Sequence, residues 1–267
     1  MIFFFSGTGN TRWAAEQIAQ ATGERLLFIP DELKGTCHYE LDDDERIGFC
    51  FPVHGWQPPH IVRQFIGKLS ISLKKPHSQP YVYAVCTCGD SIGRTIEMLQ
   101  KELAPHSLHI DSAFSLVMPE SYVCLPFMYT DTPEREHQKI AQAKEELGQY
   151  LEMIRNRVKG ETHTHRGLTP WTFSHVIGAY FNTRMITDRK FFVDADKCIH
   201  CGKCMEVCPT GDLDFRADET DTDTPLPHWR HDGSCTCCLA CYHHCPVHAI
   251  NYGQITRSRG QYYFGHK

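Results

Sequence analysis

The sequence predicts an α/β protein, a doubly wound parallel sheet, followed by a small cysteine-rich α+β domain. Over residues 1–158, short apolar runs alternate with segments of helical spacing, which is typical of parallel sheets. A glycine-containing turn, Ser6–Thr11, joins the first apolar run to the first helical segment. Eight of the 14 cysteines then recur at regular spacings within residues 191–267. These three observations define the two expected parts of the chain.

The apolar runs predict five strands, at Met1–Phe5, Arg25–Ile29, Arg46–Pro52, Tyr81–Cys86 and Ser112–Met118. Helices are expected at Thr11–Ala21, His60–Leu69, Gly93–Leu103 and from Pro133 to about Val158. The last helix opens with Thr132-Pro133-Glu134, which places proline at the first helical position. Five strands alternating with helices match the flavodoxin-like sheet order 2-1-3-4-5, whose ligand lies beside the first strand.

Residues 159–190 are expected to connect the two parts and to pack between them. This segment is too rich in apolar and aromatic residues for a free linker, and we expect a short helix there. The residues concerned are Trp171, Phe173, Val176, Ile177, Tyr180 and Phe181. The predicted domains are therefore residues 1–158, a packed connector at 159–190, and residues 191–267.

Composition excludes several classes of protein. The net charge of −5 argues against nucleic acid and anionic membranes as partners. No apolar run approaches the ~18 residues of a membrane span, and the start of the chain, Met1–Ser6, lacks the basic region of a signal peptide. Cysteines at metal-ligand spacings, in a chain too long for a small stapled scaffold, favour a reducing cytoplasm over a disulfide-rich secreted protein.

The cysteine spacing predicts two 4Fe–4S clusters, because the bacterial ferredoxin pattern C-x2-C-x2-C-x3-C-P occurs twice. In this pattern the fourth cysteine of each run ligates the other cluster. One cluster would take Cys198, Cys201, Cys204 and Cys245, and the other Cys235, Cys238, Cys241 and Cys208. Zinc is the alternative metal, but its sites seldom show this spacing. Cys237 breaks the spacing and is left out of both sets.

The turn Ser6-Gly7-Thr8-Gly9-Asn10-Thr11 follows a strand and opens a helix, so its backbone amides are expected to form an anion site. Hydroxyls of Ser6, Thr8 and Thr11 and the Asn10 amide would add donors around a phosphate monoester. The turn has no lysine, which favours the phosphate of a flavin mononucleotide. A dinucleotide fingerprint is the alternative, but Arg12 stands where its third glycine belongs.

With these motifs, nearly the whole chain resembles the flavodoxin–ferredoxin fusion proteins. Phe51-Pro52-Val53-His54-Gly55-Trp56 looks like the second flavin loop of that family, and Cys88-Gly89-Asp90 lies where its third loop approaches the flavin ring. The resemblance implies FMN as cofactor, with Trp56 or His54 covering a face of the ring and the Gly55 peptide near N5. From the residues alone, other roles are equally open. Trp56 would then be a core residue, His54 a surface residue, and Asp90 the cap of the helix that follows it.

Two weaker patterns are expected to have no catalytic role. Cys86 and Cys88 are expected to face opposite sides of the sheet, which would make them poor joint ligands. The acidic segment Asp212–Asp223 is interpreted as a solvated loop, with a docking patch for a basic redox partner as the alternative. No catalytic triad, zinc-protease motif or paired-carboxylate site stands out, so no catalytic residue is predicted.

The combination predicts an intracellular electron-transfer protein that relays electrons between two 4Fe–4S clusters and FMN, and so couples one-electron and two-electron partners. The alternative is an FMN-dependent reductase of a small organic substrate, fed by its own clusters; a redox-sensing module is a third. The expected partners are redox proteins, such as an anaerobic enzyme, with donor and acceptor unidentified. A homodimer remains an open possibility.

Overall fold

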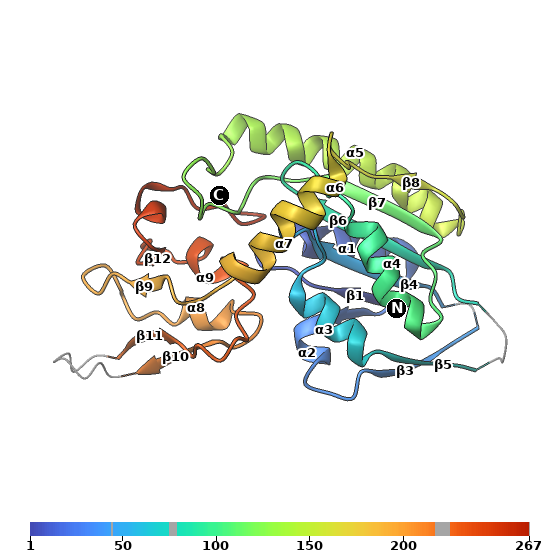
Figure 1. Cartoon of the computed structure of the whole chain (residues 1–267), viewed down its shortest axis with the longest axis horizontal. Coiled ribbons are helices and arrows are strands. Elements are labelled where there is room, and N and C mark those ends of the chain that lie inside the picture. The colour runs from blue at the N-terminus through green and yellow to red at the C-terminus, as the bar shows by residue number, and fades with distance from the viewer. Residues whose placement is uncertain (44, 75–78, 217–224, 267) are drawn as a thin grey trace.

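The computed structural model describes residues 1–43, 45–74, 79–216 and 225–266. Its centre is a six-stranded sheet in which every neighbouring pair is parallel (Figure 1). In spatial order the strands are β2 (Leu26–Phe28), β1 (Ile2–Phe4), β4 (Ile47–Pro52), β6 (Val82–Cys88), β7 (Ser112–Val117) and β8 (Thr162–His163).

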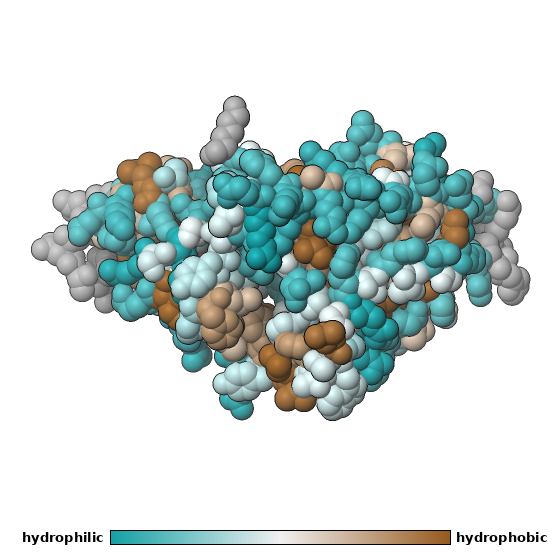
Figure 2. All heavy atoms as spheres, turned by 90° about the horizontal axis from the view of Figure 1, so that it is seen from above, coloured by the Kyte–Doolittle hydropathy of each residue, from teal (hydrophilic) through white to brown (hydrophobic). Residues whose placement is uncertain are grey.

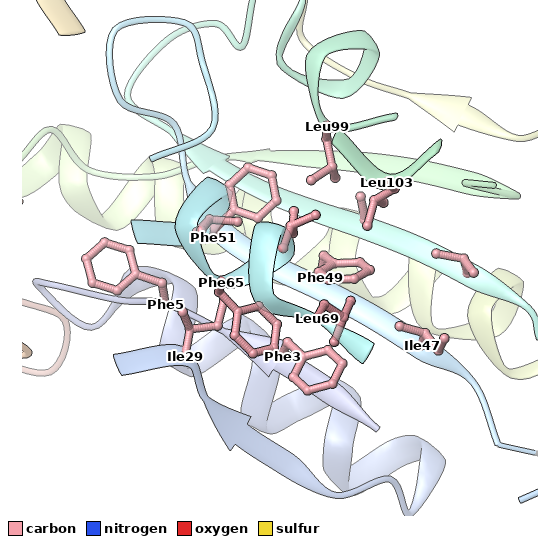
Figure 3. Packing of buried hydrophobic residues seen from close by; sticks show 14 of the residues in the cluster. Phe3, Phe5, Ile29, Ile47, Phe49, Phe51, Phe65, Leu69, Leu99 and Leu103 are labelled. Atoms are coloured by element: carbon pink, nitrogen blue, oxygen red, sulfur yellow. The ribbon is translucent and has the colours of Figure 1, made fainter. Parts of the chain in front are cut away.

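Helices cover both faces of this sheet, because successive residues of each strand point to opposite sides. On one face Phe4 and Tyr83 pack against α1 (Asn10–Thr22) and α5 (Pro133–Arg155). On the other face Phe3 and Phe49 pack against α3 and α4, as Figure 3 shows. The helices of this second face are α2 (Ile29–Glu32), α3 (His60–Lys68), α4 (Thr95–Leu103) and the short η1 (Ala104–His106). The sheet is therefore doubly wound.

The sequence analysis was wrong in predicting a five-stranded sheet. The sixth strand, β8, pairs only Thr162 and His163 with β7, so it has no apolar run that reveals it. The last helix also ends at Arg155 rather than near Val158, and Arg157 then adopts a left-handed φ of 52°. Two further short strands, β3 (His38–Leu41) and β5 (Ser70–Leu73), form a separate parallel pair.

Cys86 and Cys88 lie in the same hydrophobic cluster, so the expectation that they face opposite sides of the sheet was wrong. Residues two apart on a strand share a face because the side-chain period is two. Both thiols are buried, and burial raises the pKa of Cys88 to about 12.

The longest described helix, α5, begins as its sequence predicts. The Thr132 hydroxyl accepts a hydrogen bond from the backbone N–H of Arg135, at 3.4 Å, and Pro133 occupies the first turn. Its inner face buries residues at helical spacing, from Ala143 to Ile154. No helix in the described part of the chain is both long enough and apolar enough to cross a membrane.

The connector contains one continuous helical segment, residues 170–185, which we call the connector helix. It consists of α6 (Pro170–Thr172), α7 (Gly178–Tyr180) and two π-helical stretches, Phe173–Ile177 and Phe181–Met185. Several of its exposed side chains are apolar, among them Trp171, Val176 and Tyr180. Apolar side chains gather near the lower edge of the view in Figure 2.

The C-terminal part is built from two similar halves, each with a short helix between its cysteines. The helices are α8 (Lys203–Glu206) and α9 (Ala240–His243), and they contact each other. Two antiparallel pairs of strands flank them: β9 (Phe191–Val193) with β12 (Ile250–Tyr252), and β10 (Leu213–Arg216) with β11 (Leu226–Trp229). A 3-10 turn, Ile255–Ser258, follows.

Candidate functional site

The N-terminal turn, residues 6–11, presents the start of α1 to a cavity. Gly9 has a φ of 95°, a left-handed conformation that suits glycine, and its N–H donates to the Ser6 hydroxyl at 3.2 Å. The Trp13 N–H then donates to the Gly9 carbonyl, which begins the helix. The first N–H groups of a helix have no partners within it, so this end of α1 suits an anion.

Two side chains of the turn are held by other parts of the protein. The Asn10 amide donates to the Pro119 carbonyl at 3.2 Å, and its oxygen accepts from the Tyr262 hydroxyl at 2.6 Å. The Thr11 and Thr87 hydroxyls are hydrogen-bonded at 2.7 Å. The sequence analysis assigned Asn10 and Thr11 to phosphate binding, whereas these contacts fix the shape of the turn.

Replacing Tyr262 by Phe is expected to destabilise the protein by about 1–2 kcal/mol. Tyr262 is buried, and the change would leave the Asn10 oxygen without its 2.6 Å donor. Urea unfolding measures the effect, and Tyr263→Phe at the neighbouring half-buried tyrosine is the matched control. Equal stability of the two variants would contradict the importance of this contact.

The second loop, Pro52 to Trp56, is a tight turn closed by backbone hydrogen bonds between His54 and Gln57. Gly55 and Trp56 both have left-handed backbones, with φ of 53° and 55°. The Trp56 indole N–H donates to the Ser91 hydroxyl at 3.1 Å, and its ring centroid lies 4.6 Å from that of Phe173 on the connector helix. Trp56 therefore lines the cavity and also contacts the connector.

Burial lowers the pKa of His54 to about 4, so this side chain is neutral near pH 7. The folded protein then binds fewer protons here than the unfolded chain, whose His titrates near 6.5. Stability from neutral His54 is present above pH 6.5 and is lost as the pH falls from 6.5 toward 4. Between pH 7 and 4.5, the free energy of unfolding of a His54→Gln variant should fall by about 1–2 kcal/mol less than that of the wild type.

Urea unfolding at a series of pH values checks this expectation, with His175→Gln on the exposed side of the connector as control. Parallel stability curves for the wild type and His54→Gln would contradict it.

The third loop, Cys88 to Asp90, meets the chain after β7. A Cβ built on Gly89 would lie 2.1 Å from Oε2 of Glu120, and Lys139 donates to the Gly89 carbonyl at 3.0 Å. Asp90 does not cap the helix, because α4 begins after Arg94 and has no side-chain cap. Glycine at position 89 thus lets the Glu120 carboxylate approach the backbone.

These loops enclose a cavity of about 480 Å³, within the range of cofactor and ligand sites. The sequence analysis assigned fourteen residues to a flavin, at 6–11, 52–56 and 88–90, and of these only Gly9 does not line the cavity. Its wall also includes residues that the analysis missed, from three further segments: residues 118–122; Phe173, Ile177, Tyr180 and Phe181 of the connector helix; and residues 236–239.

Glu120 is one of the missed residues. Burial raises the pKa of its carboxyl, although the N–H groups of Tyr122 and Ser121 and the nearby Lys139 act in the opposite direction. Glu120 comes shortly after β7, and the carboxyl ends of parallel strands are where ligands bind in such sheets. That rule would have identified this loop, whereas no sequence signal marks residues 236–239 as part of the cavity.

The first cysteine set is Cys198, Cys201, Cys204 and Cys245. All four line a second, smaller cavity of about 20 Å³. Burial raises the pKa of Cys204 to about 11, with smaller effects from neighbours that include Cys245 and Cys198. The structure thus brings Cys245 to the three cysteines of the first run.

The second cysteine set is Cys208, Cys235, Cys238 and Cys241. Burial raises the pKa of Cys241 well above its ordinary value, and the thiols of Cys238, Cys235 and Cys208 act in the same direction. Thiols with raised pKa values must lose their protons to bind iron, so metal binding would release protons here.

The two halves hold their last cysteine in the same way. The N–H of Asp212 donates to Sγ of Cys208 at 3.3 Å, and the N–H of Ala249 donates to Sγ of Cys245 at 3.2 Å. Hydrogen bonds to ligand sulfur are one of the means by which a protein tunes a cluster's reduction potential.

Cys237 is buried beside the second set, and its thiol donates to the Thr187 carbonyl at 3.7 Å. Cys237 also lines the main cavity, and burial raises the pKa of its thiol to about 12.

Most of the acidic segment, residues 217–224, lies outside the described residues, and with it most of the suggested docking patch. For Asp212 the interpretation as a solvated residue was wrong. Its side chain is fully buried and accepts a hydrogen bond from the Ser234 hydroxyl at 2.9 Å.

The comparisons with known proteins agree with the cysteine pattern. Residues 191–214 match the family model of a 4Fe–4S binding domain, Fer4. Over 62 residues, 23% of the chain and 74% of the relative, the sequence is 37% identical to an uncharacterised ferredoxin of Methanocaldococcus jannaschii. Over 61 residues, 23% of the chain and 62% of the relative, it is 39% identical to pyruvate synthase subunit PorD of Methanothermobacter marburgensis.

One solved structure aligns with a larger part of the chain. The Trp repressor binding protein from Bacillus subtilis aligns over 55% of this chain and 97% of its own, with 14% identity and a TM-score of 0.32. The family is shown by the M. jannaschii match, 37% identical over 74% of that ferredoxin, and the Fer4 segment contains Cys198 to Cys208. The chain therefore belongs to the ferredoxin family, whose 4Fe–4S clusters transfer electrons.

Proposed function

We propose that this ferredoxin-family chain holds two 4Fe–4S clusters and one FMN, and relays electrons between them. The observation that carries the proposal is the main cavity. Its wall contains thirteen of the fourteen residues assigned to a flavin from the sequence, together with Cys238 of the second cysteine set. A redox-active ligand in this cavity would lie beside a cluster ligand.

The phosphate of FMN would bind at the N-terminal turn. The backbone N–H groups at the start of α1 and the Thr8 hydroxyl supply the donors, while Asn10 and Thr11 hold the turn in shape. The flavin ring would occupy the more apolar part, between the Trp56 loop, Gly89 and the connector helix. FMN accepts two electrons and can pass them on singly, whereas each cluster carries one.

The cysteines would divide into the two sets defined above, each binding one cluster through three cysteines of one run and the last of the other. The crossing would join the halves around α8 and α9, which contact each other. Within this proposal residues 1–158 form the FMN-binding domain, 159–190 the connector and 191–267 the ferredoxin domain.

The connector would hold the two domains together through contacts at both ends. The Ser174 hydroxyl donates to the Trp56 carbonyl at 2.8 Å, and the Gln57 amide donates to the Ser174 carbonyl at 2.7 Å. At its other end, the Tyr252 hydroxyl donates to the Met185 carbonyl at 3.3 Å.

Anaerobic purification, followed by iron and flavin counts and an absorbance spectrum, tests the proposal. We expect about eight irons and one FMN per chain. About four irons would leave a single cluster, and a dinucleotide or no flavin would remove the relay while leaving the ferredoxin assignment intact.

A second candidate is an FMN-dependent reductase of a small organic substrate. It is favoured by the aromatic wall that Phe173, Tyr180 and Phe181 add to the cavity, since a carrier needs only an accessible flavin edge. Reoxidation of the reduced protein separates the two. A carrier should transfer electrons faster to an oxidised ferredoxin than to a small quinone, and a reductase should show the reverse order.

The second curated relative supports a redox enzyme as partner. That protein is a subunit of pyruvate synthase, and its match to this chain spans 62% of its length. We propose by analogy that this chain exchanges electrons with a multi-subunit oxidoreductase of the cytoplasm.

A further inference from the structure

The two cysteine sets differ in their relation to the main cavity. Residues 236–239, which include Cys238, form part of its wall. The described cysteines of the first set line only the separate, smaller cavity. We propose that the second set holds the inner cluster, which exchanges electrons with the cavity ligand, and that the first set holds the outer cluster, which meets external partners. This inference rests on the proposed function.

A close contact joins the N-terminal turn to the second set. A Cβ built on Gly7 would lie 2.7 Å from Cβ of Cys238, 3.0 Å from its carbonyl oxygen and 3.2 Å from its Sγ. Any side chain at position 7 would therefore push the turn and the cysteine apart. The loop on the cysteine side has left-handed backbones at Cys237 and Leu239, with φ of 52° and 60°.

Hydrogen bonds reinforce this contact through α9, the helix between Cys238 and Cys245. One ring nitrogen of His243 donates to the Ser121 carbonyl at 2.6 Å, and the other accepts from the Tyr262 N–H at 3.0 Å. His243 thus joins the second set to a residue of the cavity wall and to the tail of the chain.

The C-terminal tail, residues 260–266, then returns to the N-terminal turn. Beyond the Tyr262 contact with Asn10, the Phe264 N–H donates to the Thr8 carbonyl at 2.8 Å. The Phe264 ring stacks on Trp13 of α1, with centroids 5.3 Å apart. These contacts hold the N-terminal turn against the second set from two sides. They keep the distance between the turn and the second set small.

The first set contains the one exposed cysteine of the two sets. Cys201 is exposed, and so is the neighbouring Ile199, at 58%. The two sets are nevertheless neighbours, since α8 and α9, which carry Cys204 and Cys241, contact each other. Electron-transfer rates fall steeply with separation, so the shortest route into the cavity runs from the first set to the second and from there across the Gly7 contact.

The electron count follows from this order. A reduced ferredoxin-type donor would deliver one electron to the outer cluster, which passes it to the inner cluster and on to the cavity ligand. Two such transfers, with two protons from water, complete the reduction of one FMN, and two donor molecules are oxidised.

A matched pair of variants tests the order: Cys204→Ala in the first set and Cys241→Ala in the second. Both cysteines are the third of their run, both are buried, and neither lines the main cavity. Electron paramagnetic resonance identifies the remaining cluster. Laser-flash reduction with a deazaflavin sensitiser then follows how electrons redistribute between that cluster and FMN. We expect Cys204→Ala to equilibrate at near the wild-type rate and Cys241→Ala at least tenfold more slowly.

A third variant, Gly7→Ala, covers the case in which Cys241→Ala does not fold. It should keep both clusters but slow the same exchange and weaken FMN binding. Gly148→Ala, where an added Cβ meets nothing within 4 Å, should leave the exchange rate and the FMN affinity unchanged.

Equal rates in the two cysteine variants, the reverse order, or an unaffected Gly7→Ala would overturn the inference while the proposed function stands. A wild-type chain that binds no FMN would overturn the proposed function, and this inference with it.

Discussion

Replacing Gly178 by Ala is expected to weaken ligand binding in the main cavity at least tenfold and to destabilise the protein by about 1–3 kcal/mol. A Cβ at this position in α7 would lie 2.1 Å from the Gly55 carbonyl oxygen and 2.8 Å from that of Phe173. Both contacts are with backbone, so no side-chain rotation relieves them. The connector helix must move away from the Trp56 loop, and both form the cavity wall.

Asn182 makes such a movement costly, because its amide donates to the His54 carbonyl at 3.0 Å and to the Gly55 carbonyl at 3.5 Å. A shift of the helix therefore breaks hydrogen bonds as well as packing. Fluorescence titration with FMN measures the affinity, and urea unfolding measures the stability.

Gly148→Ala in α5 is the matched control, because both changes add a methyl group to a helical glycine. At Gly148 nothing lies within 4 Å of the added Cβ, so the change should stabilise the protein by about 0.5–1 kcal/mol and leave FMN affinity unchanged. If Gly178→Ala also stabilises the protein, the connector helix does not pack closely against the Gly55 loop.

Replacing Gly48 by Ala should destabilise the protein by about 1–3 kcal/mol through overpacking of the central sheet. Gly48 in β4 pairs with Tyr83 in β6, and the Tyr83 ring fills the space that a side chain would need. A Cβ at position 48 would lie 2.4 Å from Cζ of Tyr83. The ring is fully buried beneath α1 and α5, so it has little room to move.

Urea unfolding of Gly48→Ala is best compared with Gly67→Ala in α3, where an added Cβ meets nothing within 4 Å. The two substitutions should change the free energy of unfolding in opposite directions. A second change, Tyr83→Val, should recover part of the loss in a double-mutant cycle, because it removes the ring that causes the clash. Independent, additive effects at positions 48 and 83 would show that the ring does not cover Gly48.

Much of the sheet could be predicted from local sequence. The strands near Phe3, Phe49 and Val85 are continuous apolar runs, because both faces of a doubly wound sheet are buried. β8 could not be found this way, since its two residues, Thr162 and His163, are polar and exposed and their strand conformation depends on pairing with β7.

Local sequence patterns also could not predict which polar residues are buried. Asp212 begins an acidic stretch, which by composition indicates a solvated loop, yet its side chain is buried against Ser234, 22 residues away. Asn10 likewise has its partner, Tyr262, at the other end of the chain. A hydrogen bond between distant segments satisfies such a group, and residue type alone does not reveal that bond.

The sequence by itself determined the chemistry of the two kinds of site. Cysteine spacing within a few residues decides which thiolates can wrap around one iron–sulfur core, and a glycine turn between a strand and a helix decides where unpaired N–H groups are presented. Both are properties of short segments. Only the tertiary structure decided that Gly7 touches Cys238 and that residues 118–122, 173–186 and 236–239 complete one cavity. Those segments meet because burying the connector and the C-terminal tail against the sheet domain brings together residues that are more than 100 positions apart.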